Sequence, residues 1–241
     1  MKKDKKFTKY QERGAYHQQQ MKRSIFTFNA FVHLRYQQVL KLIPKNRKIK
    51  LLDVGCGEGA LLSLIKQKTK ASVVGIDPEV ESFKSINSLK IIKGSAYKLP
   101  FKPSSFDYII STEVIEHLSQ TKKYLLEINR VLKPKGRLII TTLVKLSETP
   151  EDKMHVKEYT PLELKNLLNQ YFDKVTIKTS HPAWLKKLYT FTFVKISKYH
   201  LDIFRWLINL IVLTIKSNPF NLKLGQLSQQ IAICQNKKAL K

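Results

Sequence analysis

The sequence predicts an α/β fold built on a mostly parallel sheet with helices on both faces. From Ile49 onward, short apolar runs rich in β-branched residues alternate with amphipathic stretches, a pattern typical of strands and helices around such a sheet. The first of these runs ends in a glycine-rich turn that opens an apolar-faced helix. With 241 residues, of which 43% are hydrophobic, the chain is long enough to bury the core of one α/β domain with appendages.

Hydrophobic periodicity assigns the elements in order along the chain. Residues 1–24 are polar and weakly periodic, and residues 25–43 carry apolar side chains at helical spacings up to Pro44, so an arm and then a helix are expected. Seven strands should follow, at residues 49–54, 72–77, 89–93, 106–111, 137–143, 174–180 and 229–235. Helices are expected between them at residues 61–68, 80–84, 120–132 and 161–170.

An insertion rich in aromatic residues and lysines, residues 181–227, separates the sixth strand from the seventh. Within it, residues 203–215 hold ten apolar residues out of thirteen. A helix of that length reaches about 20 Å, short of the roughly 30 Å hydrocarbon core, so no membrane span is expected. We therefore divide the chain into an N-terminal arm and helix (1–48), a core (49–180), a helical insertion acting as a substrate lid (181–227), and a last strand with its tail (228–241).

Positive charge is concentrated at the two ends of the chain. The sequence has 44 Lys+Arg against 18 Asp+Glu, a formal net charge of +26, and residues 181–241 hold ten basic side chains and one acidic one. Such ends attract nucleic acid, anionic lipid or phosphorylated substrates. Because 37 of the 44 basic residues are Lys, whereas bidentate phosphate and base recognition favours Arg, nucleic acid is the less favoured partner and compositional bias is an alternative.

The insertion helix, the cysteines and the N-terminus indicate where in the cell the protein resides. If residues 203–215 are helical, Asp202, Arg205, Asn209 and Lys216 form one narrow polar stripe beside a broad apolar sector, which either packs on the core or contacts an anionic membrane surface. The two cysteines match no disulfide or zinc spacing, and no apolar run follows the cationic N-terminus before Ile25. We expect a cytoplasmic protein, with peripheral membrane contact as the alternative to packing of this sector on the core.

The run Asp53-Val54-Gly55-Cys56-Gly57-Glu58-Gly59 is the most informative motif. Glycines let the backbone turn sharply under a ligand, and a helix N-terminus offers N–H groups to a carboxylate. The same spacing also fits dinucleotide-binding folds. Asp53, however, opposes a pyrophosphate and attracts an ammonium group, and Asp77 at the end of the second strand suits two ribose hydroxyls.

Taken in order, the motifs resemble the class I S-adenosylmethionine-dependent methyltransferases, a group that includes quinone-biosynthesis and bacterial small-molecule and saccharide enzymes. The resemblance runs from about Ile49 to Phe172 through LLDVGCGEG, VVGIDPEV, GSAYKLPF, SFDYIISTEVIEHL, EINRVLKPKGRLIITT and HVKEYTPLELKNLL. It implies a methyltransferase enzyme with the Rossmann-like class I fold, a seven-stranded sheet, and S-adenosyl-L-methionine as cofactor.

The resemblance also assigns the cofactor residues. The methionine side of the cofactor is expected at Asp53, Gly55, Cys56, Gly57 and Gly59. The ribose is expected at Asp77, the adenine beside Pro78, Ser95 and Ala96, and the floor of the cleft at Ser111. Relatives usually carry Asp at the position of Ser95, so a hydroxyl replaces the usual acceptor of the adenine amino group.

The acceptor is expected beyond the fourth strand. A hydroxyl acceptor must lose its proton during methyl transfer, and Glu116, His117 and His155 are the candidate catalytic residues. Glu113, Glu116 and His117 have the spacing of one helix face. Similar sets of residues hold magnesium in the terminal 2′-hydroxyl RNA methyltransferases, which this stretch resembles. The same residue pattern also occurs in relatives without a metal. We therefore expect no metal ion here.

The expected function is methyl transfer to a hydroxyl of a small, lipid-linked or saccharide acceptor. The net charge of +26 and the Glu-Glu-His set keep an RNA 2′-O-methyltransferase as an alternative. A non-catalytic binding protein with a methyltransferase fold is a second alternative, and a nicotinamide oxidoreductase is a third.

Overall fold

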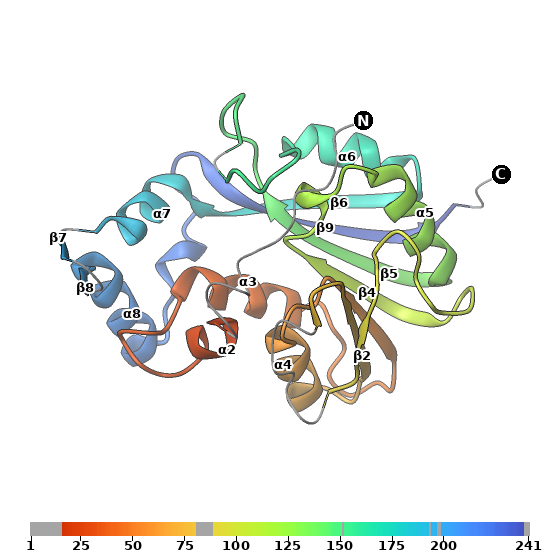
Figure 1. Cartoon of the computed structure of the whole chain (residues 1–241), viewed down its shortest axis with the longest axis horizontal. Helices are drawn as coiled ribbons and strands as arrows, with labels where there is room; N and C mark the ends of the chain where they lie inside the picture. Colours follow the sequence, from red (N-terminus) through yellow and green to blue (C-terminus); the bar gives the residue numbers. More distant parts are fainter. Residues whose placement is uncertain (1–15, 81–88, 151, 193, 197–198, 239–241) are drawn as a thin grey trace.

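The computed structural model describes residues 16–80, 89–150, 152–192, 194–196 and 199–238. A seven-stranded sheet in the order β3-β2-β1-β4-β5-β9-β6 forms its centre (Figure 1). All neighbouring pairs from β3 to β5 are parallel, and only β9 runs antiparallel to its neighbours β5 and β6. The prediction of a seven-stranded, mostly parallel sheet is confirmed.

The strands agree closely with the apolar runs of the sequence. Their bounds are Lys50–Val54 (β1), Ser72–Asp77 (β2), Ile91–Lys93 (β3), Phe106–Thr112 (β4), Leu132–Leu143 (β5), Phe172–Pro182 (β6) and Leu227–Lys237 (β9). Strand β5 begins five residues earlier than predicted, because Leu132 already pairs with Phe106 before a register shift in β4.

Helices cover both faces of the sheet. They are α3 (Ala30–Leu40), α4 (Ala60–Lys68), α5 (Thr121–Val131) and α6 (Pro161–Asn169). Helices α5 and α6 share one buried apolar cluster with the sheet, and α3 and α4 share a second one on the other face. Burial of alternate strand residues into these two clusters supplies the main apolar contribution to stability.

The N-terminal region differs from the single helix predicted over residues 25–43. A short helix α2 (Tyr16–Gln20) comes first, and α3 begins only at Ala30. The side chain of Asn29 accepts a hydrogen bond from the backbone N–H of Val32 and caps α3. The helix predicted at residues 80–84 lies almost wholly outside the described residues.

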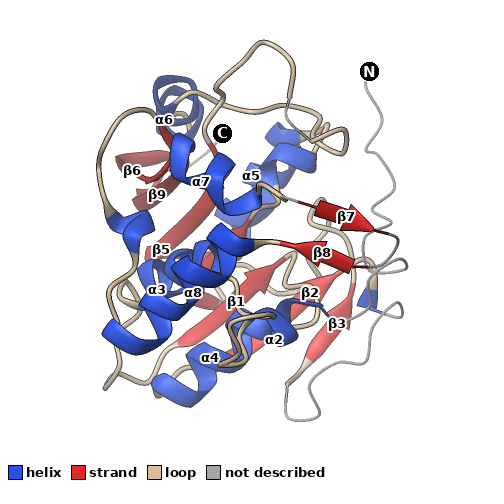
Figure 2. Cartoon of the chain, turned by 90° about the vertical axis from the view of Figure 1, so that its left-hand side faces the viewer, coloured by secondary structure: helices blue, strands red, loops and turns tan. Residues whose placement is uncertain are grey.

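The insertion forms two helices and a small hairpin at one end of the molecule (Figure 2). Its elements are α7 (Ala183–Thr190), β7 (Val194–Ile196), β8 (Tyr199–Leu201), α8 (Ile203–Ile215) and the single turn η3 (Pro219–Asn221). Helix α8 has the predicted bounds, and it shares a third buried apolar cluster with α7, η3 and the start of α3. In the described part of the chain, no helix has the length and apolar character needed to cross a membrane.

Candidate functional site

The glycine-rich turn joins β1 to α4 at the carboxyl edge of the sheet. Gly55, Gly57 and Gly59 all adopt positive φ, at 75°, 53° and 83°, a conformation that costs other residues energy. The backbone N–H groups of Gly55 and Cys56 donate to the carbonyl of Ile76, over 2.8 and 3.2 Å. The turn is therefore held against the end of β2.

Two carboxylates meet beneath this turn. Asp77 accepts hydrogen bonds from the backbone N–H groups of Gly57 (2.8 Å) and Glu79 (2.9 Å). Asp53 is buried, and its Oδ1 has no hydrogen-bond partner among the residues that the structure describes. Burial, and then the neighbouring charge of Asp77, raise the pKa of Asp53 to about 8. Burial also raises the pKa of Asp77. This pair of acids favours a cationic ligand.

A cavity of about 940 Å³ opens along the carboxyl ends of β1, β2 and β4. Its lining includes six of the predicted cofactor residues: Gly55, Cys56, Asp77, Pro78, Ser95 and Ala96. The other four lie behind the lining, where they support the turn or the strands: Asp53, Gly57, Gly59 and Ser111. The hydroxyl of Ser111 donates to the carbonyl of Val54 over 3.0 Å and so ties β4 to β1.

The N-terminal region and helix α7 form one wall of the cavity. The residues that line this wall are Tyr16 and His17 from α2, Arg35 from α3, and Lys186 from α7. The Glu58 carboxylate, at the far end of the glycine turn, accepts hydrogen bonds from backbone N–H groups at the start of α2, including that of Gln18. The glycine turn therefore helps to hold the short helix α2 in place.

The predicted helix face of Glu113, Glu116 and His117 is wrong. Glu113 has a positive φ of 57° directly after β4, and residues Ile115–His117 form one 3-10 turn, η2. Glu113 points instead to the Arg35 guanidinium, which lies 2.9 Å from its Oε2. Thr141 and Gln229 also donate to Glu113, over 3.0 and 2.8 Å. The left-handed residue breaks the helical spacing on which the prediction rested.

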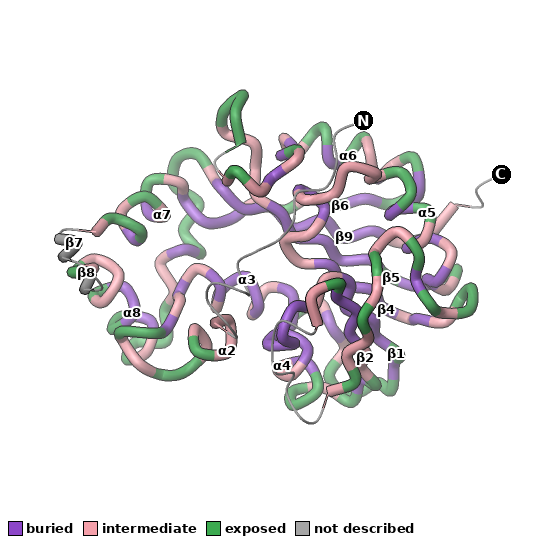
Figure 3. The backbone as a smooth tube through the Cα atoms, in the orientation of Figure 1, coloured by how far each residue is buried: buried purple, intermediate pink, exposed green. Residues whose placement is uncertain are grey.

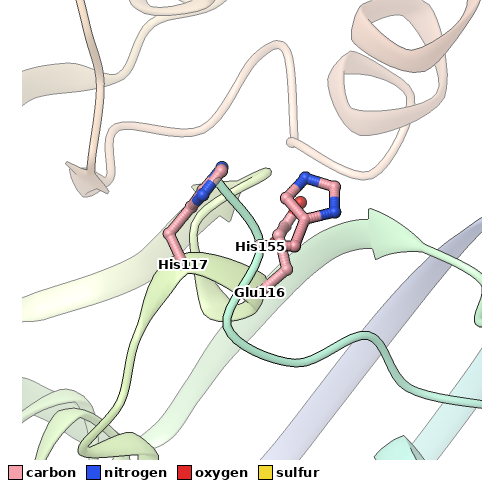
Figure 4. A group of neighbouring side chains, drawn as sticks. All are labelled: Glu116, His117 and His155. Carbon is pink, nitrogen blue, oxygen red and sulfur yellow. The ribbon is translucent and has the colours of Figure 1, made fainter. Parts of the chain in front are cut away.

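Glu116, His117 and His155 do come together (Figure 4). One ligand-type atom from each lies within 4.8 Å of the others, and the two imidazole rings are 4.9 Å apart between centroids. Burial, and then the charge of Glu113, raise the pKa of Glu116 well above its usual value. The sequence prediction therefore selected three residues that share one end of the cavity.

Hydrogen bonds fix both imidazole rings. His155 Nδ1 lies 2.6 Å from Oε1 of the buried Glu158, and His117 Nδ1 lies 3.1 Å from the carbonyl oxygen of Met154. Since a carboxylate and a carbonyl only accept, each Nδ1 carries the hydrogen, and the basic lone pair of each ring is on Nε2. An imidazole held in this way by a carboxylate is suited to accept a proton.

Sequence reasoning missed three residues of the site. Arg35 and Glu58 gave no local signal, because their roles depend on α2 and α3 packing over a turn far away in the sequence. Glu158 carried a weak signal, since it follows His155 by three residues. A search for carboxylates near candidate histidines would have selected it.

Residues 52–140 match a protein family described as a methyltransferase domain. That segment contains the glycine turn, Asp77, Ser95 and the η2 turn. The matched segment, which forms the core of the chain, resembles the class I S-adenosylmethionine-dependent methyltransferases. The resemblance accounts for the joint occurrence of the glycine turn and the acid at the end of β2.

Individual proteins show the same likeness over part of their length. The chain is 29% identical over 149 residues to a probable S-adenosylmethionine-dependent methyltransferase of Mycolicibacterium smegmatis, covering 57% of this chain and 58% of that protein. It is 38% identical over 109 residues to the mitochondrial ubiquinone biosynthesis O-methyltransferase of Mus musculus, covering 40% of this chain and 29% of that one. The aligned segments span about half or less of these relatives.

Among solved structures, the fold is similar to that of phosphoethanolamine N-methyltransferase 2 from Haemonchus contortus, which was solved with phosphomonomethylethanolamine and S-adenosylhomocysteine. The TM-score is 0.64 at 18% sequence identity, and the match covers 96% of this chain and 58% of that one. At this identity the likeness supports the fold alone.

Proposed function

We propose that this methyltransferase transfers the methyl group of S-adenosyl-L-methionine to a hydroxyl of a small saccharide or lipid-linked acceptor. One observation carries the proposal: His155, held by Glu158, lines both the 940 Å³ cavity and a neighbouring cavity of about 580 Å³. A base at the junction of two chambers is placed to act between a methyl donor in one and an acceptor in the other.

The residues of the larger cavity fit the donor. Its volume lies in the range typical of cofactor sites, and the unpartnered Oδ1 of Asp53 lies below the turn proposed to hold the methionine moiety. Asp77 would hold the ribose, and Pro78, Ser95 and Ala96 would surround the adenine. When bound, S-adenosylmethionine supplies an electrophilic methyl group on a sulfonium, which leaves as a neutral thioether.

The residues around His155 would handle the proton. The Glu158 carboxylate keeps the hydrogen on Nδ1 and stabilises the imidazolium that forms when Nε2 accepts the hydroxyl proton of the acceptor. Burial and the charge of Glu113 raise the pKa of Glu116, which favours the protonated form of this carboxyl and would let it serve as a hydrogen-bond donor. His117 would complete the wall on which the acceptor oxygen rests.

The smaller cavity indicates the class of acceptor. Its walls are mostly charged and carry both signs: Lys145, Glu148, Asp152, Lys153, Lys157, Glu158 and Glu163. Such walls suit a molecule with several hydroxyl groups better than a flat apolar ring. A saccharide, free or carried on a lipid, fits this chamber.

The test uses methyl-labelled donor and cell extract fractionated into RNA, lipid and small molecules. We expect label in the lipid or small-molecule fraction, and we expect His155→Gln to lower the rate by about 100-fold or more, the scale of general-base catalysis, while cofactor binding stays within twofold. His33→Gln is the matched control, because His33 is part-buried but does not line either cavity. Label in RNA alone would overturn the choice of acceptor.

A second candidate is an RNA 2′-O-methyltransferase that uses a divalent metal ion. The cluster of Glu116, His117 and His155 favours it, because oxygen and imidazole ligands suit such an ion. The Arg35–Glu113 ion pair opposes it, since Glu113 is already neutralised by a cation beside the cluster. We therefore propose a reaction that needs no metal. The intact glycine turn and the fixed His155 both favour an enzyme over a non-catalytic binding protein.

A further inference from the structure

Helix α8 turns apolar side chains toward solvent. Ile203, Leu207, Leu210 and Ile211 are all exposed, and their spacing of i, i+4, i+7 and i+8 places them on one helix face. Leu207 is 52% exposed, and Ile215 at the end of the helix is 70% exposed. Exposed apolar residues gathered on one helix mark a surface that contacts something else.

Within the polar stripe of α8, Asn209 and Arg205 contact the rest of the protein, whereas Lys216 is exposed. Asn209 is fully buried, donates to the carbonyls of Ile25 (2.7 Å) and Phe28 (2.8 Å), and accepts from the Tyr189 hydroxyl (2.8 Å). The guanidinium of Arg205 lies 5.8 Å from the centre of the Tyr189 ring. Ile208 and Val212 are buried beside Asn209 in the third apolar cluster, so both apolar and polar contacts anchor α8. Unlike an ordinary surface helix, whose outer side is polar, α8 presents a second apolar face to solvent.

The segment before α3 extends the apolar surface. Phe26 is 61% exposed and packs edge-on against Trp206 of α8, with ring centroids 5.4 Å apart. Arg23 donates to the carbonyl of Leu213 over 3.1 Å in the last turn of α8. We call the side chains of Phe26, Ile203, Leu207, Leu210, Ile211 and Ile215 the docking face. Figure 3 shows the burial pattern at this end of the molecule.

The chain around the docking face is basic. The sequence has no acidic residue between Glu12 and Asp53, and only Asp202 between Asp173 and the end of the chain. Asp202 is already engaged, since it accepts from the Thr192 hydroxyl over 2.9 Å and lies 3.8 Å from Arg205. Exposed cations lie within or beside the elements at this end: Lys22 precedes α3, Lys187 is in α7, Lys216 follows α8, and Lys223 follows η3.

We propose that the docking face binds an anionic lipid bilayer, with α8 lying in the plane of the interface. The apolar side chains would enter the acyl boundary while the surrounding lysines and Arg23 contact anionic head groups. A second copy of the chain fits less well, because pairing two such faces brings two sets of like charges together. The adjoining helix α7 supplies Lys186 to the cofactor cavity, so docking would bring a lipid-linked acceptor near the site. That last step rests on the proposed function.

The test is co-sedimentation with vesicles of phosphatidylcholine, alone or mixed with phosphatidylglycerol. The protein should sediment with the mixed vesicles and not with the neutral ones, and binding should weaken as salt rises. The double variant Leu207→Glu with Leu210→Glu should bind at least about tenfold more weakly, because it places charges in the apolar interface. Leu162→Glu is the matched control, since Leu162 is 67% exposed on α6 and lies outside the docking face.

A second pair of variants separates charge from apolar contact. Lys187→Glu with Lys216→Glu should weaken binding to mixed vesicles, whereas Lys165→Glu on α6 should not. Thermal unfolding and cofactor calorimetry on each variant would show that fold and donor site are unchanged, so the outcome is independent of the methyl-transfer assay. Absence from both vesicle types would overturn the proposal. So would a dimer in light scattering that the double leucine variant dissociates.

Discussion

Binding of S-adenosylmethionine should release a proton from Asp53. In the free protein, burial and Asp77 raise the pKa of Asp53 to about 8. The donor carries a sulfonium and an ammonium group, and a positive charge near the turn stabilises the ionised carboxylate and lowers its pKa. S-Adenosylhomocysteine lacks the sulfonium charge, so it should lower the pKa less.

The size of the effect follows from the pKa. At pH 7, a carboxyl with a pKa of about 8 is about nine-tenths protonated, so complete ionisation on binding would release about 0.9 proton per donor bound. The same shift affects stability. Since the pKa is raised from 3.8, the stabilising contribution of Asp53 is fully present below pH 3.8 and is lost as the pH rises through about 8. Across that window the free energy of unfolding should fall by up to about 1.4 kcal/mol per pH unit from this group.

Isothermal titration calorimetry in buffers of different ionisation enthalpy measures the released protons directly. We expect release close to one proton with the donor at pH 7, less with S-adenosylhomocysteine, and little at pH 9. Asp53→Asn should abolish the release and flatten the pH dependence of unfolding between pH 4 and 8. Asp107→Asn is the control, because Lys133 lowers the pKa of Asp107 and its stabilising contribution is instead lost in acid. Equal proton release by the wild type and Asp53→Asn would refute the reasoning.

Three further predictions concern the same cavity. Asp77→Ala should weaken donor binding by about 1.5–3 kcal/mol, which is roughly 10- to 150-fold, because a charged acceptor of the ribose hydroxyls is lost; calorimetry showing less than a twofold change would contradict the ribose assignment. Glu58→Ala should raise hydrogen exchange in residues 16–20 and speed donor dissociation, since α2 loses the carboxylate that holds its first N–H groups; unchanged exchange there would mean that other contacts hold α2. Methyl transfer should persist in EDTA, and its loss in chelator with recovery in magnesium would favour the metal-dependent alternative at Glu116, His117 and His155.

The fold was predictable wherever local periodicity was strong. Strand Ser72–Asp77 and helix Ile203–Ile215 have their predicted bounds, because β-branched alternation and a long apolar run each favour one state over short range. The boundary at Ala30 was missed, because Asn29 acts as a helix cap only once the preceding segment turns away. The position of strand β9 in the sheet, between β5 and β6, depends on long-range pairing that no local pattern encodes.

Part of the candidate site was predictable from local motifs, and the rest depends on long-range packing. Gly55, Asp77 and Ser95 were identified by motif, and all three line the cavity. The Arg35–Glu113 ion pair joins residues 78 positions apart, so only packing of α3 across the sheet edge could bring it about. The contact between Glu58 and the start of α2 has the same origin.

The sequence by itself determined the resemblance to methyltransferases, the glycine turn and the residues that end the strands, because these depend on backbone conformations and spacings encoded within a few residues of one another. Only the tertiary structure decided which way the side chains face. It turned Glu113 toward Arg35, through one left-handed residue. It also buried Asn209 and exposed Leu207 on the same helix. The direction in which a side chain points depends on the neighbours that pack against its helix or strand, and those neighbours are distant in the chain.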